Sequence, residues 1–202
     1  LPITLLIGFL GSGKTTFLNR LLRSSSMKNT LVVVNEIGDI PVDHLLEREI
    51  DERTVVLPSG CLCCSLREDL LEVLDNSDLM RGRDHVVVET SGLADPTPLV
   101  ATIVRHPAVR ERFHLSSIVA TLDGTSAADV CAKYVEAPKQ LALADRVIIT
   151  KCDLASDDEV RVAQTLARSL SPACDIVHVW RRRRRCDELR RVSTPRSAGR
   201  RS

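Results

Sequence analysis

The sequence has few aromatic residues and no long apolar run. Only 2% of its 202 residues are aromatic, so aliphatic side chains must form the core, and a base-stacking surface for nucleic acid is not expected. No apolar run reaches the roughly 18 residues of a membrane span, and no secretory signal is visible. Seven cysteines, three of them clustered, favour metal thiolates over a disulfide framework. We therefore expect a cytoplasmic protein without a membrane partner.

The charge is distributed unevenly along the chain. Residues 181–202 contain ten arginines against Asp187 and Glu188, a net charge of +8, which leaves −7 for residues 1–180 because the total is +1. This tail has too few apolar residues to pack. We predict one domain over residues 1–180 and an Arg-rich tail that is disordered or non-native. The alternative is a basic arm for nucleic acid or acidic partners.

Short apolar runs alternate with helical patterns along the domain. Helical periodicity begins at Lys14 and at Leu66, and returns at residues 98–104 and 160–170. The alternation predicts an α/β fold with a mostly parallel sheet and helices on both faces. Such sheets bind ligands beyond the carboxyl ends of their strands. The predicted strands are residues 3–7, 31–34, 55–57, 86–88, 118–122, 147–149 and 176–180.

A glycine-rich motif follows the first predicted strand. Residues 8–15, GFLGSGKT, match G-x-x-x-x-G-K-[ST] between a strand and a helix, which predicts a P-loop NTPase rather than a chance turn. Backbone N–H groups and the helix N-terminus would hold phosphate oxygens. Lys14 would act catalytically on the β- and γ-phosphates, and the Thr15 hydroxyl would ligate Mg²⁺. The candidate phosphate-binding residues are Gly11, Ser12, Gly13, Lys14, Thr15 and Thr16.

Two further strands end in polar motifs. Glu89 follows three valines, where a carboxylate would lie beside Mg²⁺ as a catalytic and metal-side group; the alternative is an acid that faces solvent. Thr150, Lys151 and Asp153 fit [NT]-K-x-D. The carboxylate would accept both the N1–H and the exocyclic amine of guanine, which favours GTP over ATP. Asp153 could instead, or also, cap the next helix. Ser91 would begin a turn near the γ-phosphate.

The clustered thiols predict a soft-metal site. Cys61, Cys63 and Cys64 would bind a transition metal and leave one tetrahedral position open, which favours transfer over permanent binding. Redox chemistry is the main alternative. His44 and Glu36 are conceivable additional ligands. Cys131, Cys152 and Cys174 are interpreted as structural, and His85 as one of several packing or surface histidines.

An acidic segment lies between the phosphate motif and the cysteines. Residues 35–43 would form a switch loop that orders around Mg²⁺ and the γ-phosphate and relaxes after hydrolysis. Its alternative is a solvated acidic loop. Asp43 or Glu36 would position the attacking water as a catalytic residue.

Taken in order, these motifs resemble the CobW family of metal-handling GTPases. The matching pieces are GFLGSGKTT, NEIGD, SGCLCC, ETSGLADP and QLALADRVIITKCDL. The resemblance implies GTP hydrolysis, Mg²⁺ dependence and delivery of a metal, zinc or cobalt, to a client metalloprotein. Ser59 stands where the family usually has Asn. The family continues into a second α/β domain, which we expect to be absent here.

The resulting hypothesis is a GTP-hydrolysing metallochaperone that couples nucleotide state to binding and transfer of a thiolate-ligated metal. One alternative is a nucleotide-dependent metal sensor or buffer with incidental hydrolysis. Another is an ATP-using enzyme with structural cysteines, which residues 150–153 disfavour. A homodimer is left open.

Overall fold

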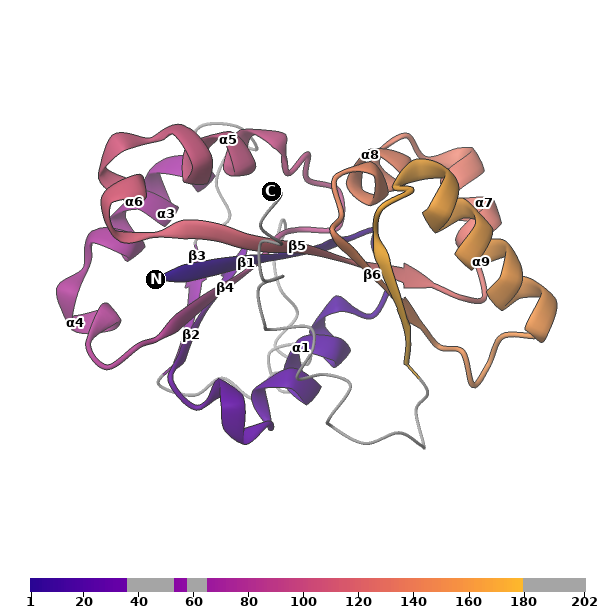
Figure 1. The fold of residues 1–202 in the computed structure, drawn as a ribbon, viewed down its shortest axis with the longest axis horizontal. Helices are drawn as coiled ribbons and strands as arrows, with labels where there is room; N and C mark the ends of the chain where they lie inside the picture. The colour runs from indigo at the N-terminus through magenta and orange to yellow at the C-terminus, as the bar shows by residue number, and fades with distance from the viewer. Residues whose placement is uncertain (36–52, 58–64, 180–202) are drawn as a thin grey trace, which may run out of the picture.

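The computed structural model describes residues 1–35, 53–57 and 65–179, and these contain one seven-stranded sheet (Figure 1). The strand order is β3-β2-β4-β1-β5-β6-β7, and every pair is parallel. The acidic loop after Asn35, the cysteine cluster and the Arg-rich tail lie outside the described residues. The strands are β1 (Pro2–Gly8), β2 (Thr30–Asn35), β3 (Thr54–Leu57), β4 (His85–Glu89), β5 (His114–Asp123), β6 (Arg146–Thr150) and β7 (Asp175–His178).

Helices cover both faces of the sheet, as predicted (Figure 1). Helix α1 and the short 3-10 helix η1 lie on one face, and the helices from α3 to α9 lie on the other. Among the described helices, none is long and apolar enough to cross a membrane. The helices are α1 (Lys14–Leu22), η1 (Ser25–Met27), α3 (Ser65–Asp75), α4 (Ser77–Met80), α5 (Thr97–Arg105), α6 (Pro107–Arg112), α7 (Ala127–Lys133), α8 (Glu136–Ala142) and α9 (Asp157–Leu170).

The strands are apolar on both sides because both faces of the sheet are covered. In β2, Leu31 and Val33 pack into the larger core, whereas Val32 and Val34 pack into the smaller core under α1. This alternation follows from the two-residue period of a strand. A sheet buried on both faces explains why the predicted strands are continuous aliphatic runs.

The register places the polar strand ends at one edge. Gly8 at the end of β1 is level with Thr121 of β5, and Asp123 is level with Thr150 of β6. On the other side of β1, Leu6 is level with Glu89. Because all described strands are parallel, the loops that follow them leave from the same edge. The predicted motifs that lie among the described residues are therefore brought together at this edge of the sheet.

A buried histidine connects two central strands. His85 Nε2 and Thr4 Oγ1 lie 2.9 Å apart in a hydrogen bond between β4 and β1. Only 8% of His85 is exposed. Burial lowers the pKa of His85, and the nearby Asp84 carboxylate opposes this shift only in part. His85 is thus a packing residue that is held neutral.

We expect the fold to lose stability between pH 7 and pH 5 because of His85. The pKa of His85 lies below 6.5 in the folded state, so the unfolded chain binds the proton first and the free energy of unfolding falls as pH falls. His85→Gln, which keeps a hydrogen-bonding group toward Thr4, should reduce this slope. Urea unfolding at several pH values measures it. His114→Gln, at an exposed position, is the control, and equal slopes in all three proteins would contradict the prediction.

Candidate functional site

The loop between β1 and α1 is shaped by glycines with left-handed or unusual backbone angles. Gly8 has φ +144° and Gly13 has φ +86°. A Cβ at Gly8 would lie 2.3 Å from Thr121 Oγ1 and 2.7 Å from the Thr121 carbonyl oxygen, so no side chain fits there. Gly13 caps α1 without a side-chain hydrogen bond, and the first turn contains no acidic residue. The first-turn N–H groups therefore face a site suited to an anion.

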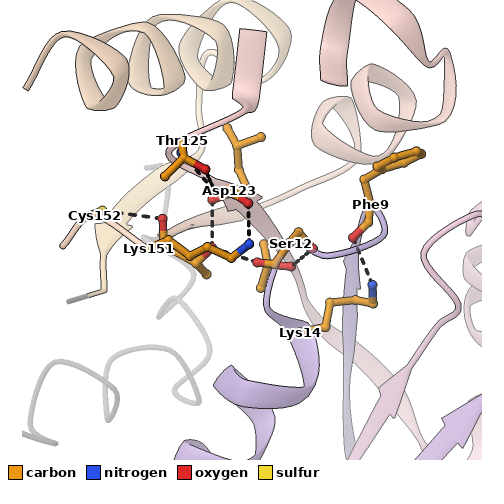
Figure 2. Close-up of polar contacts among 10 residues, drawn as sticks. Phe9, Ser12, Lys14, Asp123, Thr125, Lys151 and Cys152 are labelled. Atoms are coloured by element: carbon orange, nitrogen blue, oxygen red, sulfur yellow. Dashed lines mark hydrogen bonds and ion pairs between the residues drawn. The ribbon is translucent and has the colours of Figure 1, made fainter. Parts of the chain in front are cut away.

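Lys14 closes this loop on itself. Its ammonium donates to the carbonyl oxygen of Gly8 at 2.7 Å. It also donates to the carbonyl oxygen of Phe9 at 3.2 Å, the bond drawn in Figure 2. The charge is thereby kept at the mouth of the loop in a defined position.

Ser12 is held by two neighbouring strands rather than pointing outward. Its hydroxyl lies 2.7 Å from Thr121 Oγ1, and its carbonyl accepts a 2.8 Å hydrogen bond from Thr150 Oγ1. The side chain is 3% exposed. The Ser12 hydroxyl therefore has a structural role in the described arrangement. The predicted guanine motif and the P-loop are joined directly through Thr150.

Thr15 and Glu89, the two residues predicted to lie beside Mg²⁺, contact each other. Thr15 Oγ1 donates to Glu89 Oε1 at 3.2 Å. Glu89 is 3% exposed, so the alternative of an acid facing solvent is wrong. A hydroxyl and a carboxylate next to a phosphate loop are the hard oxygen donors that Mg²⁺ prefers. These residues fit the magnesium ion that a nucleotide triphosphate would bring.

A cavity of about 230 Å³ lies between α1 and the end of β6. Its walls come from both the P-loop side and the predicted guanine motif. The cavity thus adjoins the phosphate loop where the nucleoside of a bound nucleotide would lie. Its lining residues are Gly13, Thr16, Phe17, Arg20, Thr150, Lys151, Asp153, Leu154 and Val179.

Lys151 is positioned by Asp123. Its ammonium lies 2.6 Å from Asp123 Oδ2, and its backbone adopts a left-handed φ of 54° (Figure 2). Burial raises the pKa of Asp123, but hydrogen bonds from Lys151 and Thr125 outweigh burial, and the net pKa is lowered. Asp123 therefore stays ionised and holds the lysine stem along the cavity wall.

Asp153 lines the cavity but does not cap the following helix. Helix α9 is capped by Ser156, whose hydroxyl accepts from the Glu159 N–H while the Glu159 carboxylate accepts from the Ser156 N–H. The helix-cap interpretation of Asp153 is therefore wrong. Its exposed carboxylate lines the cavity.

The three cysteines that were interpreted as structural all lie among the described residues, and each is a free thiol. Cys152 and Cys174 are 2% and 1% exposed, and Cys131 is half-buried. Burial is the main cause that raises the pKa of each of the three thiols. Within residues 1–35, 53–57 and 65–179, no three His, Cys, Asp or Glu side chains are grouped to hold a metal. Cys61, Cys63, Cys64, Glu36, Asp43 and His44 lie outside the described residues.

Sequence reasoning missed three residues of this region. Asp123 ends β5 at the same edge as Thr150, and this strand-end position was its only signal. Arg20 lines the cavity from α1, one turn beyond the motif. Gln140 is a buried amide on α8, and its only signal was its place at the start of the segment QLALADRVIITKCDL.

A glycine-rich loop that opens a helix, with a buried acid and a T-K-x-D strand end at the same sheet edge, defines a P-loop nucleotide-binding protein. Residues 2–178 match the family model described as the CobW/HypB/UreG nucleotide-binding domain. The chain belongs to this family, which confirms the resemblance noted above.

Similar proteins include the zinc chaperone YjiA of Escherichia coli, 34% identical over 88% of this chain and 58% of the relative. The zinc chaperone CobW of Pseudomonas aeruginosa is 32% identical over 90% of this chain and 57% of the relative. The chain thus spans less than two thirds of either relative's length.

Solved structures agree on the fold. The Zn(II)-bound YjiA GTPase from E. coli has a TM-score of 0.64 at 25% identity, covering 90% of this chain and 58% of that one. Nickel-bound HypB from Helicobacter pylori has a TM-score of 0.61 at 20% identity, covering 87% and 77%. At this level of sequence identity, the similarity to HypB shows a shared fold and nothing further.

We expect Gly8→Ala to destabilise the protein far more than Gly82→Ala. Both glycines have positive φ, but a Cβ at Gly82 meets nothing within 4 Å, whereas one at Gly8 collides with Thr121. Gly82→Ala should cost about 1–2 kcal/mol of backbone strain. Gly8→Ala should cost about 1–3 kcal/mol more, from overpacking against a fixed strand. Urea unfolding compares the two, and equal losses would contradict the prediction.

Proposed function

We propose that this chain is the GTP-binding and GTP-hydrolysing domain of a zinc metallochaperone. One observation carries the proposal: a single cavity is lined both by the end of the phosphate loop and by the T-K-x-D strand end. Phosphate-binding and base-recognising groups therefore serve one nucleotide. The names of the relatives, zinc chaperone and zinc-regulated GTPase metalloprotein activator, support the metal side of the proposal.

The base end of the cavity favours guanine. The Asp153 carboxylate would accept the N1–H and the exocyclic amine of guanine, a donor pair that adenine lacks. The Lys151 stem, held by its 2.6 Å ion pair with Asp123, would lie along the purine plane. Phe17 and Leu154 add apolar wall to the same cavity. A site built on such hydrogen bonds discriminates strongly against a base that cannot make them.

The phosphate end supplies positioned charge. Lys14 would exchange its contacts with the loop carbonyls for β- and γ-phosphate oxygens, and the first-turn N–H groups of α1 would hold the same phosphates. Thr15 and Glu89 would hold Mg²⁺, which when bound neutralises charge on the phosphate oxygens. The remaining phosphate contacts are assigned to Gly11, Gly13 and Thr16, and orientation of the attacking water to Asp43.

The metal cargo would be held by Cys61, Cys63 and Cys64, with zinc or cobalt as candidates. Leu57, four residues before Cys61, is level with Asn35 of β2, and the preceding Val34 is level with Glu89 of β4. Because β2 lies between β3 and β4, Leu57 is separated from strand β4, which ends at Glu89, by two strand spacings, or roughly 10 Å. Four residues reach roughly 13 Å. A chain of this length can span this separation, and this reach supports our proposal that the thiols and the nucleotide are coupled, with a client metalloprotein as the acceptor in a reducing cytoplasm.

We expect Asp153→Asn to weaken GTP binding about tenfold or more, because an amide cannot accept both guanine donors. The same variant should gain affinity for xanthosine triphosphate, whose 2-carbonyl can accept from the new amide. Competition binding with GTP, ATP and xanthosine triphosphate measures both effects. Asp157→Asn, an exposed acid in the first turn of α9, is the matched control. Equal GTP and ATP affinity in the unchanged protein would exclude the guanine assignment.

We expect zinc affinity to differ about 5- to 150-fold between complexes with a non-hydrolysable GTP analogue and with GDP. The switch segment would be ordered in only one of these states, and a ligand without state preference shifts nothing. Zinc titration in both complexes tests this, with Cys61→Ser expected to remove the difference and Cys131→Ser to retain it. Identical affinities would sink the coupling. If neither the metal nor a client protein changes the rate of GTP hydrolysis, the result would favour the alternative of a metal sensor or buffer with incidental hydrolysis.

A further inference from the structure

The loop that follows β4 is held by a glutamine from a distant helix. Gln140, on α8, donates through its side-chain Nε2 to the carbonyl oxygen of Gly92 at 3.1 Å and to that of Ala94 at 3.0 Å. Both amide N–H groups are thus used on one loop. The interaction joins positions 46 and 48 residues apart in the chain. Nothing in the phosphate or base contacts described above requires this residue.

Gln140 is buried as deeply as the aliphatic core. It is 1% exposed and is one of the largest fully buried side chains. An amide removed from water is unfavourable unless its hydrogen bonds are replaced. Leu141 and Ala137, its buried neighbours on α8, need no polar partner. The burial of this amide is therefore compensated by the two loop carbonyls to which it donates.

The loop that Gln140 holds lies directly against the phosphate loop. A Cβ at Gly92 would be 2.6 Å from the backbone nitrogen of Leu10, so the two backbones touch. Ala94 N–H closes a turn onto the Ser91 carbonyl at 3.2 Å. This turn begins two residues after Glu89, the proposed metal-side acid. A shift of the turn would therefore move groups on both sides of the phosphate.

Gln140 also borders the underside of the phosphate loop. It lines a cavity of about 20 Å³ together with Gly8, Phe9 and Leu10. Its Oε1 is buried and has no hydrogen-bond partner within the part of the chain that the structure describes. One amide thus lies between the two loops that meet at the phosphates. The Nε2 group of Gln140 donates to the loop that follows β4, and the Gln140 side chain borders the phosphate loop across the small cavity.

We propose that Gln140 is a positioning residue for phosphate chemistry, which fixes the Ser91–Ala94 turn against the P-loop from behind. This inference rests on the proposed GTPase function. Binding of the γ-phosphate requires the turn to lie at a set distance from Lys14 and Thr15, and Gln140 sets that distance without touching the nucleotide. Displacement by about 1 Å at such a site costs up to about 100-fold in rate.

The test is Gln140→Leu, which keeps the volume of the side chain but removes both donors. We expect kcat for GTP hydrolysis to fall about 10- to 100-fold, while GDP affinity changes less than about threefold. Ser171→Ala is the matched control, since it removes a 2.9 Å side-chain bond to the Ala144 carbonyl at the opposite edge of the sheet. Its kcat should stay within about twofold of the unchanged protein.

A second variant keeps the proposal testable if Gln140→Leu does not fold. Gln140→Glu retains the shape, and its carboxylate cannot donate, but protonation restores one O–H donor. Its kcat relative to that of the unchanged protein should therefore rise as pH falls from 8 to 6. A ratio that is constant over this range, or a Gln140→Leu protein with unchanged kcat, would overturn the proposal. The proposal would also be overturned if kcat and GDP affinity fell by the same factor in Gln140→Leu.

Amide hydrogen exchange separates this inference from the function on which it rests. In Gln140→Leu, amides of residues 91–95 should exchange faster than in the unchanged protein, and a non-hydrolysable GTP analogue should protect them less. If the unchanged protein does not hydrolyse GTP, the proposed function fails, while the exchange difference still reports on the turn. Equal exchange in the two proteins would remove Gln140 from its assigned role.

Discussion

The site depends on the way Ser12 is tied to two neighbouring strands. Its hydroxyl bonds to Thr121 of β5, and its carbonyl accepts from Thr150 of β6, at 2.7 and 2.8 Å. These bonds are buried, where competition from water is weak and a lost partner is costly. They make the position of the phosphate loop a consequence of the sheet register. The strand end that we propose recognises the base is therefore tied directly to the phosphate loop.

Charged and amide side chains then position the parts of the site that backbone pairing leaves free. Asp123 holds the Lys151 ammonium at the rim of the cavity, and its own pKa is lowered by that bond despite burial. Gln140 holds the turn after β4 by two backbone carbonyls. Asp123 lies outside the motifs quoted from the sequence, and Gln140 opens the segment QLALADRVIITKCDL without a role having been assigned to it there. Each acts through a residue that is far away in the sequence: Asp123 through Lys151, and Gln140 through Gly92 and Ala94.

The local sequence pattern was sufficient to predict the strands and the longer helices, but it did not predict the short helices. Continuous aliphatic runs identified all seven strands, although β7 ends at His178 in the described chain. The short helices α4, α6, α7 and α8 were not predicted, because four to seven residues carry too little periodicity. Helix α4 is instead capped by Asn76, whose side chain accepts from the Asp78 and Leu79 N–H groups.

By itself, the sequence determined which chemical groups stand at each strand end: glycines that allow a phosphate loop, the hydroxyl of Thr15 and the carboxylate of Glu89, and the Asp153 carboxylate that we propose accepts from guanine. It did so because those properties reside in single residues and their immediate spacing. Only the tertiary structure decided that Asp123 faces Lys151, that Ser156 rather than Asp153 caps α9, and that Gln140 supports the turn at Gly92. Contacts between residues far apart in the chain are set by register and packing, which no local pattern encodes.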